Sequence, residues 1–207
     1  STADSSAVFG INNTATISAG SFIGGTGNQI TGGNNNAVFG ELNKSNNDGS
    51  TSFSTHSTIG GYSNGTDAPY TVLFGQQNSA YATAHGSTVV GERNLTNGPL
   101  SLVYGNSARA LIDGEFTHAS GQFSPILPLT QPLGEAQSTE YIARGRLTLF
   151  GGSTPNLLSV DGLGKNYPLQ IDSAYFFHIM LIGKRTGATA GHEMGCYEIK
   201  GLAAGPS

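Results

Sequence analysis

Val72-Leu73-Phe74-Gly75 is followed by Thr88-Val89-Val90-Gly91 and then by Leu102-Val103-Tyr104-Gly105, at intervals of 16 and 14 residues. A short apolar stretch that ends in glycine occurs eight times in the first 121 residues. The glycines are Gly10, Gly24, Gly40, Gly60, Gly75, Gly91, Gly105 and Gly121. A repeat of about fifteen residues is too short for an independent helical or propeller unit, and it suits one coil of a stacked β-solenoid. The repeat therefore predicts an all-β solenoid of about eight coils over residues 1–124.

A second regularity follows most of these glycines. A small polar residue stands three positions after the glycine in six copies, as Asn13, Asn43, Ser63, Asn78, Asn94 and Ser124. Because asparagine tolerates positive φ, we expect these residues at tight corners between strands. The polar tract 43–55 fills the longest interval and is predicted to be a loop inserted at one corner.

The alternation of side chains along each strand predicts which residues face inward. We expect the residues one and three positions before the glycine to fill the interior, and the residue between them to point outward. Those outward residues form a mostly apolar stripe that is too large to leave exposed on a monomer. The stripe is the predicted trimer interface: Val8, Phe22, Val38, Thr58, Leu73, Val89 and Val103. The alternative is that both faces lie inside one thick sandwich.

The repeated order of small residue, two apolar residues, glycine and then Asn or Ser resembles the head repeats of YadA-like trimeric autotransporter adhesins. The resemblance covers residues 5–124 in eight copies in register. It implies a left-handed parallel β-roll in which three chains surround one axis, a homotrimer. Many phage tail fibres and head fibres carry similar repeats.

The rest of the chain reads as a linker and a second domain. Four residues in the segment 125–135 are Pro125, Pro128, Pro132 and Gly134, which predict a Pro-rich linker. Residues 136–207 are predicted to form a small antiparallel β-domain with strands over 139–150, 157–160, 173–184 and 193–202. The segments 174–177, 182–186 and 196–201 resemble a C-terminal β-domain common in tailed-phage fibre and virion structural proteins, which implies a virion component.

Composition excludes several classes of partner. The net charge of −4 provides no basic footprint for nucleic acid and no polybasic patch for anionic membranes. No apolar run is long enough for a membrane-spanning helix, so we expect no membrane insertion. The single cysteine, Cys196, is predicted to be a buried, inert thiol. No signal peptide is recognised, and the start at Ser1 without Met is typical of a processed chain or a piece of a longer protein.

Candidate chemistry is sparse, and we predict no catalytic residue, no cofactor and no metal. Asp113 and Glu115 flank Gly114 as the one spacing that suits an acid–base pair, although a solvated corner explains them better. His118 stands near the end of the array, where three copies around an axis could hold an ion, but a hydrogen-bonded histidine is the commoner outcome. The candidate glycan contacts are Tyr62, Tyr70 and Tyr81.

These observations predict a structural and adhesive protein, not an enzyme. The first hypothesis is a homotrimeric tail-fibre protein of a tailed bacteriophage, located on the virion, that contacts other virion proteins and binds a host-surface glycan or protein. The alternatives are a capsid head fibre or decoration protein, a bacterial trimeric autotransporter adhesin head on the cell surface and, least favoured, a polysaccharide depolymerase.

Overall fold

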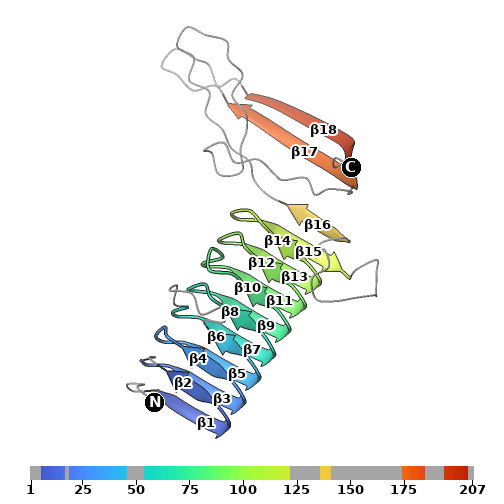
Figure 1. The fold of residues 1–207 in the computed structure, drawn as a ribbon. Coiled ribbons are helices and arrows are strands. Elements are labelled where there is room, and N and C mark those ends of the chain that lie inside the picture. The colour runs from blue at the N-terminus through green and yellow to red at the C-terminus, as the bar shows by residue number, and fades with distance from the viewer. Residues whose placement is uncertain are drawn as a thin grey trace, which may run out of the picture. The chain divides into compact units, whose positions relative to one another are not determined.

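The computed structural model describes residues 6–16, 19–45, 54–121, 136–140, 174–184 and 194–204. In these residues the chain is all-β, without a helix. It divides into two units, residues 1–166 and residues 167–207. The first is a parallel β-solenoid and the second contains a two-stranded antiparallel ribbon (Figure 1).

Two sheets run along the solenoid. The larger sheet has one five-residue strand from each coil and an additional strand at its end. Its strands are β1 (Ala7–Ile11), β3 (Phe22–Thr26), β5 (Ala37–Glu41), β7 (Thr58–Tyr62), β9 (Val72–Gln76), β11 (Thr88–Glu92), β13 (Leu102–Asn106), β15 (Phe116–Ser120) and β16 (Gln137–Glu140). All neighbours pair in parallel except β15 and β16, which are antiparallel.

The smaller sheet has two or three residues from each coil. Its strands are β2 (Thr14–Thr16), β4 (Gln29–Thr31), β6 (Lys44–Ser45), β8 (Gly65–Thr66), β10 (Ser79–Ala80), β12 (Leu95–Thr96) and β14 (Arg109–Ala110). Seven such strands mean that the chain makes about seven full turns before β15, one fewer than the eight coils predicted. Of the inserted loop predicted over 43–55, residues 43–45 belong to a regular coil, and most of the remainder lies outside the described residues.

The glycines that align between coils are not all those chosen from the sequence. The aligned residues are Gly10, Gly25, Gly40, Gly61, Gly75, Gly91 and Gly105, followed by Ala119. The predictions of Gly24, Gly60 and Gly121 as repeat markers were therefore wrong. The glycines of this column have φ between 101° and 122°, and a Cβ on any of them would lie 2.0 to 2.1 Å from the carbonyl oxygen of the next coil. In the pairs Gly24-Gly25 and Gly60-Gly61, the second glycine fills the column because only glycine fits there.

A ladder of asparagines, buried in every coil after the first, connects the coils beside this glycine column. The ladder residues are Asn13, Asn28, Asn43, Asn64, Asn78 and Asn94. Each side-chain Oδ1 accepts the backbone N–H of the equivalent residue in the next coil at 2.8–3.0 Å. Each Nδ2 donates to the carbonyl of the corner glycine in the next coil at 2.7–2.9 Å. The ladder satisfies buried backbone groups where the chain turns between the sheets.

The expected role of these asparagines at positive-φ corners was wrong. The residue just before the ladder position has positive φ instead, as at Asn12, Ser63 and Gln77. Of the six residues predicted at corners, Ser63 alone among those described has positive φ, because it precedes the ladder residue Asn64. The asparagines occupy these positions because of the hydrogen bonds that their side chains make to neighbouring coils, and not because of their own backbone conformation.

The solenoid interior is narrow and contains aliphatic and small side chains. The second residue of each large-sheet strand fills it, and these residues are fully buried: Ile23, Val38, Ile59, Leu73, Val89 and Val103. Opposite them, the smaller sheet contributes Ile30, Ala80 and Ala110, together with the buried hydroxyls of Thr66 and Thr96. The predicted alternation is therefore inverted in most coils, because the bulky residue next to the glycine points outward.

The C-terminal end of the array and the second unit complete the fold. β16 belongs to the predicted C-terminal domain (136–207) by sequence but pairs with β15 of the solenoid. The Pro-rich linker 125–135 and the strand predicted over 157–160 lie outside the described residues. In the second unit, β17 (Ala174–Lys184) and β18 (Met194–Ala204) pair along eleven residues each, which confirms the strands predicted over 173–184 and 193–202.

The asparagine ladder predicts a large effect of a single buried substitution. Asn78→Leu removes the donor to the Phe74 and Gly91 carbonyls and the acceptor for the Asn94 N–H. Leaving such groups unpaired costs about 1–3 kcal/mol each, so we expect the free energy of unfolding in urea to fall by about 3 kcal/mol or more. The exposed neighbour Gln76→Ala is the control and should change it little. A loss no larger for Asn78→Leu than for Gln76→Ala would contradict a structural role of the ladder.

Candidate interaction surfaces

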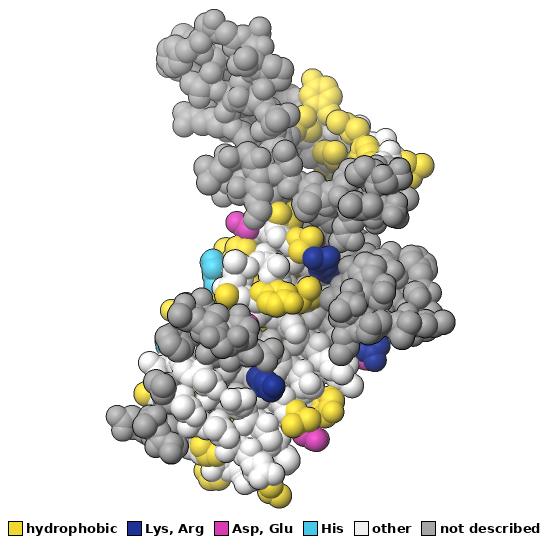
Figure 2. Space-filling view, viewed as in Figure 1, with side chains coloured by type: hydrophobic (Ala, Val, Ile, Leu, Met, Phe, Trp, Pro, Cys, Tyr) yellow, Lys and Arg dark blue, Asp and Glu magenta, His cyan; other side chains and the backbone are white. Residues whose placement is uncertain are grey.

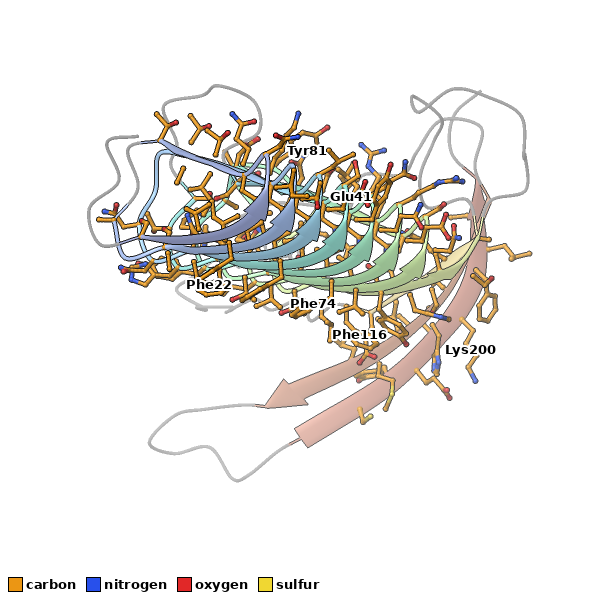
Figure 3. The ribbon with its side chains drawn as sticks, turned by 90° about the horizontal axis from the view of Figure 1, so that it is seen from below. Phe22, Glu41, Phe74, Tyr81, Phe116 and Lys200 are labelled. Atoms are coloured by element: carbon orange, nitrogen blue, oxygen red, sulfur yellow. The ribbon has the colours of Figure 1, made fainter. Side chains whose placement is uncertain are left out.

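The outer face of the large sheet has an apolar stripe, to which each strand from β1 to β15 except β7 contributes a large side chain. It is formed by side chains at the first and third positions of the strands, which alternate with the buried second position. We call this set the outer stripe, and its members are between 37% and 60% exposed: Phe9, Phe22, Phe39, Phe74, Val90, Leu102, Tyr104 and Phe116. Phe22, Phe74 and Phe116 project from the same face of the sheet (Figure 3).

The rings of the outer stripe pack on one another along the solenoid. Phe22 lies between Phe9 and Phe39, with ring centroids at 5.4 and 5.1 Å. Tyr104 contacts Phe116 at 5.4 Å, and the His118 ring stacks on Tyr104 at 4.4 Å. Such spacings suit favourable tilted or offset ring pairs. The rings therefore form a preorganised surface.

Two glycines in the third-position column make room for these rings. A Cβ on Gly24 would meet the Phe22 ring at 3.3 Å, and a Cβ on Gly60 would lie 2.7 Å from the Phe74 ring. Gly24 and Gly60 therefore leave space on the outer face for rings of the outer stripe, whereas Gly25 and Gly61 belong to the corner column. This division of roles explains why the pairs Gly24-Gly25 and Gly60-Gly61 occur.

The first and third columns contain no acidic or basic residue over the eight strands from β1 to β15, apart from His118. Charge begins at the fifth strand position, where Glu41 and Glu92 lie at the rim of this face. Interfaces commonly have an apolar centre and a polar rim of this kind. The first and third columns therefore form an uncharged face whose rim has charged residues.

The predicted trimer-interface residues lie elsewhere than expected. Val38, Leu73, Val89 and Val103 are fully buried in the core, so they offer no surface to another chain. Val8 belongs to the same inward column, although it is exposed at the open end of the stack. Phe22 and Thr58 do lie on the outer face, because the true corner glycine of their coils is one residue further on. The outward stripe exists, but it is formed mainly by the residue adjacent to the glycine.

The three tyrosines predicted as glycan contacts are exposed but separate. Tyr62 ends β7 in the large sheet, and Tyr81 directly follows β10 in the smaller sheet. Tyr70 lies at the turn between the sheets, where its ring stacks on His56 at 5.3 Å. The structure therefore does not bring them together, and each stays a separate candidate contact.

A shallow hollow lies over the turns of three successive coils. Its volume is about 480 Å³, and it is lined by Thr83, His85, Asn97, Pro99, Leu111 and Asp113. The turn from β10 to β11 is two residues longer than the next turn, and Thr83 in the longer turn donates to the Asn97 carbonyl at 2.7 Å. The longer turn therefore contributes Thr83 and His85 to the lining of the hollow.

Asp113 and Glu115 do not form an acid–base pair. The Glu115 side chain is buried, and its Oε2 accepts the backbone N–H groups of Leu111 and Ile112 at 2.7 and 3.0 Å. Its Oε1 accepts the Thr117 hydroxyl at 3.0 Å. Asp113 instead lines the hollow. Glu115 therefore stabilises the last turn of the solenoid.

The ribbon has a second, mixed surface. Hydrophobic side chains gather over β17 and β18, whereas the visible face of the solenoid is mainly uncharged and polar (Figure 2). On one face of the ribbon, Glu198 Oε1 lies 2.9 Å from Lys200 Nζ and 2.7 Å from His178 Nε2. These contacts, the Lys200 hydrogen bond foremost and then that of His178, hold the pKa of Glu198 below its ordinary value. Cys196 is exposed, so the prediction that it is buried was wrong.

Comparison with known protein families, curated proteins and solved structures finds no match to this chain. In the part of the chain that the structure describes, no group of three or more His, Cys, Asp or Glu side chains could hold a metal ion. The same residues contain no helix long and apolar enough to cross a membrane.

The contacts of Glu198 with Lys200 and His178 predict a measurable change in the Glu198 pKa when either partner is replaced. Lys200→Met should raise the pKa of Glu198 toward its ordinary value, because the ammonium that favours the ionised carboxylate is removed. His178→Gln should raise it by less. A carbon-detected NMR titration of the Glu198 carboxyl measures both, with Lys44→Met in the solenoid as the control. An unchanged pKa in Lys200→Met would refute the assignment of its cause.

Proposed function

We propose that this chain is a structural and adhesive fibre protein of a tailed bacteriophage, in which three copies pack side by side along the outer stripe. The single observation that carries the proposal is the uncharged, ring-lined face that extends from β1 to β15. Burying the exposed part of one such ring contributes on the order of 1–2 kcal/mol. Eight aligned large apolar residues on each chain therefore favour association strongly.

The sequence repeat supports the choice of a trimer. Its resemblance to YadA-like head repeats implies three β-rolls around one axis, and an elongated apolar face on each roll suits that arrangement. The left-handed winding of the roll belongs to the same proposal. Because phage fibres carry similar repeats, the proposed location is the virion: the tail in the first hypothesis and the capsid, as a head fibre, in the second.

Adhesion would come from many weak contacts. The exposed tyrosines Tyr62, Tyr70 and Tyr81 are candidate contacts for a host glycan, and three chains would present nine such rings. Linked binding of this kind raises the overall affinity without strengthening any single contact. A hydrogen-bonded solenoid keeps the spacing of the rings fixed, so the proposed shaft is rigid.

The native mass tests the proposed assembly. We expect light scattering to give three times the chain mass of 21.3 kDa for the unmodified chain. Phe74→Glu puts a charge in the centre of the outer stripe and should lower the mass to that of a monomer, since an unpaired charge is costly to bury. Leu100→Glu changes a leucine that is more exposed than Phe74, at a turn away from this face, and should remain trimeric. A monomeric unmodified chain would contradict the proposal.

The position on the virion needs a separate measurement. Antibodies raised against the solenoid should label the tail fibres of virions in electron microscopy, because the proposed fibre is exposed along its length. Labelling confined to the capsid would support the head-fibre alternative. Virions that carry no label would exclude both.

A further inference from the structure

The two ends of the solenoid differ in whether they can accept another coil. We propose that the N-terminal edge, formed by β1 and β2, is a docking site for one more parallel β-coil that carries glycine opposite Gly10 and asparagine three residues later. The partner is thus a polypeptide segment of the same repeat chemistry. This inference is independent of the proposed trimer, because it concerns the end of the stack and not its side.

No strand among the described residues covers the core at this end. Val8 occupies the inward column, whose next six members are fully buried, yet Val8 is 45% exposed. Phe9 and Ile11 of the same strand are more exposed still, at 60% and 64%. Both sheets end here, the larger at β1 and the smaller at β2. An edge of this kind presents unpaired backbone groups above an unfinished hydrophobic core.

The polar ladder is also unfinished at this end. In each later coil, the ladder residue donates its backbone N–H to the asparagine of the preceding coil, as Asn28 does to Asn13. The carbonyl of each later corner glycine accepts a hydrogen bond from the asparagine Nδ2 of the preceding coil, as the Gly25 carbonyl does from Asn13. The described residues contain no coil before β1 that could do the same for the Asn13 N–H and the Gly10 carbonyl. One asparagine side chain would satisfy both groups.

The close approach of coils restricts the sequence that can dock. A Cβ on Gly10 would lie 2.0 Å from the carbonyl oxygen of Gly25, and the same distance recurs through the stack to Gly105 and Ala119. A residue stacked before Gly10 would meet the Gly10 carbonyl in the same way. It must therefore be glycine, and an ordinary edge-seeking β-strand does not fit.

The C-terminal end is closed, so a second copy cannot supply the docking coil from that end. Ala119 takes the place of the corner glycine, and Ala108 ends the asparagine ladder. β16 covers β15 in antiparallel pairing and contains no glycine. The Gln137 side chain covers β14 as a further strand would, accepting the Arg109 N–H at 2.9 Å and donating to its carbonyl at 3.2 Å.

A grafted coil tests the proposal in the full chain. Residues 87–100 are copied in place of residues 1–5, so that the copy ends at the position equivalent to Leu100 and continues into Ser6. Hydrogen exchange should then slow by about tenfold or more at the Asn13 amide, because it gains an acceptor. The thermal midpoint should rise by several degrees, because Val8 becomes covered.

Matched grafts decide whether docking is specific. Gly91→Ala in the copy should abolish the protection, and Asn94→Ala in the copy should remove it at Asn13. Glu92→Gln in the copy should leave the gain intact. The amides of β9 report in every variant that the original solenoid is folded. Equal protection by all grafts, or none from the unmodified copy, would overturn the proposal. So would concentration-dependent pairing of β1 with β1 in the unmodified chain, which would assign this edge to a second copy.

Discussion

The close contact between the corner glycines and the next coil determines most of this architecture. Each glycine adopts positive φ and approaches the neighbouring carbonyl so closely that no side chain fits. This approach places the carbonyl within reach of the asparagine Nδ2 at 2.7–2.9 Å. The glycine thus lets the chain turn between the sheets, and the asparagine pairs the backbone groups at that turn.

The narrow cross-section that results also determines the surface. The interior has room for Val, Ile, Leu, Ala and small polar side chains, and all of the aromatic rings in the large-sheet strands lie outside. The rings then pack along the stack, and Gly24 and Gly60 provide space for them. An exposed apolar face is therefore a consequence of a core that is too thin for aromatic residues.

The fold class could be predicted from the sequence, but not which residues of each strand face inward and which face outward. The spacing of the glycines indicated parallel coils correctly, because a steric requirement repeats wherever coils stack. Phe74 was expected inside and Leu73 outside because hydrophobicity alone does not reveal the width of the core. The pairs Gly24-Gly25 and Gly60-Gly61 were ambiguous for the same reason, since a shift of one residue exchanges the two faces. An asparagine three residues after the aligned glycine was a signal for the ladder that could have resolved the register, and it recurs as Asn28, Asn43, Asn64, Asn78 and Asn94.

Glu115 and three uncharged residues close the C-terminal end of the array. The Glu115 carboxylate binds two backbone N–H groups of the last turn, in a position where earlier coils have Ser57, Thr71 or Ser101. In earlier coils a hydroxyl oxygen accepts the backbone N–H of the next coil, as Ser87 does from Ser101. The Glu115 carboxylate can accept several hydrogen bonds at once, and it binds N–H groups of its own turn instead. The other columns also end here. Ala119 replaces the corner glycine, Ala108 replaces the ladder asparagine, and the Gln137 side chain caps β14. These departures from the repeat fall together in the last coil and its cap, so the two ends of the stack differ. The C-terminal end is covered by β16, whereas the proposed docking site for a further coil lies at β1.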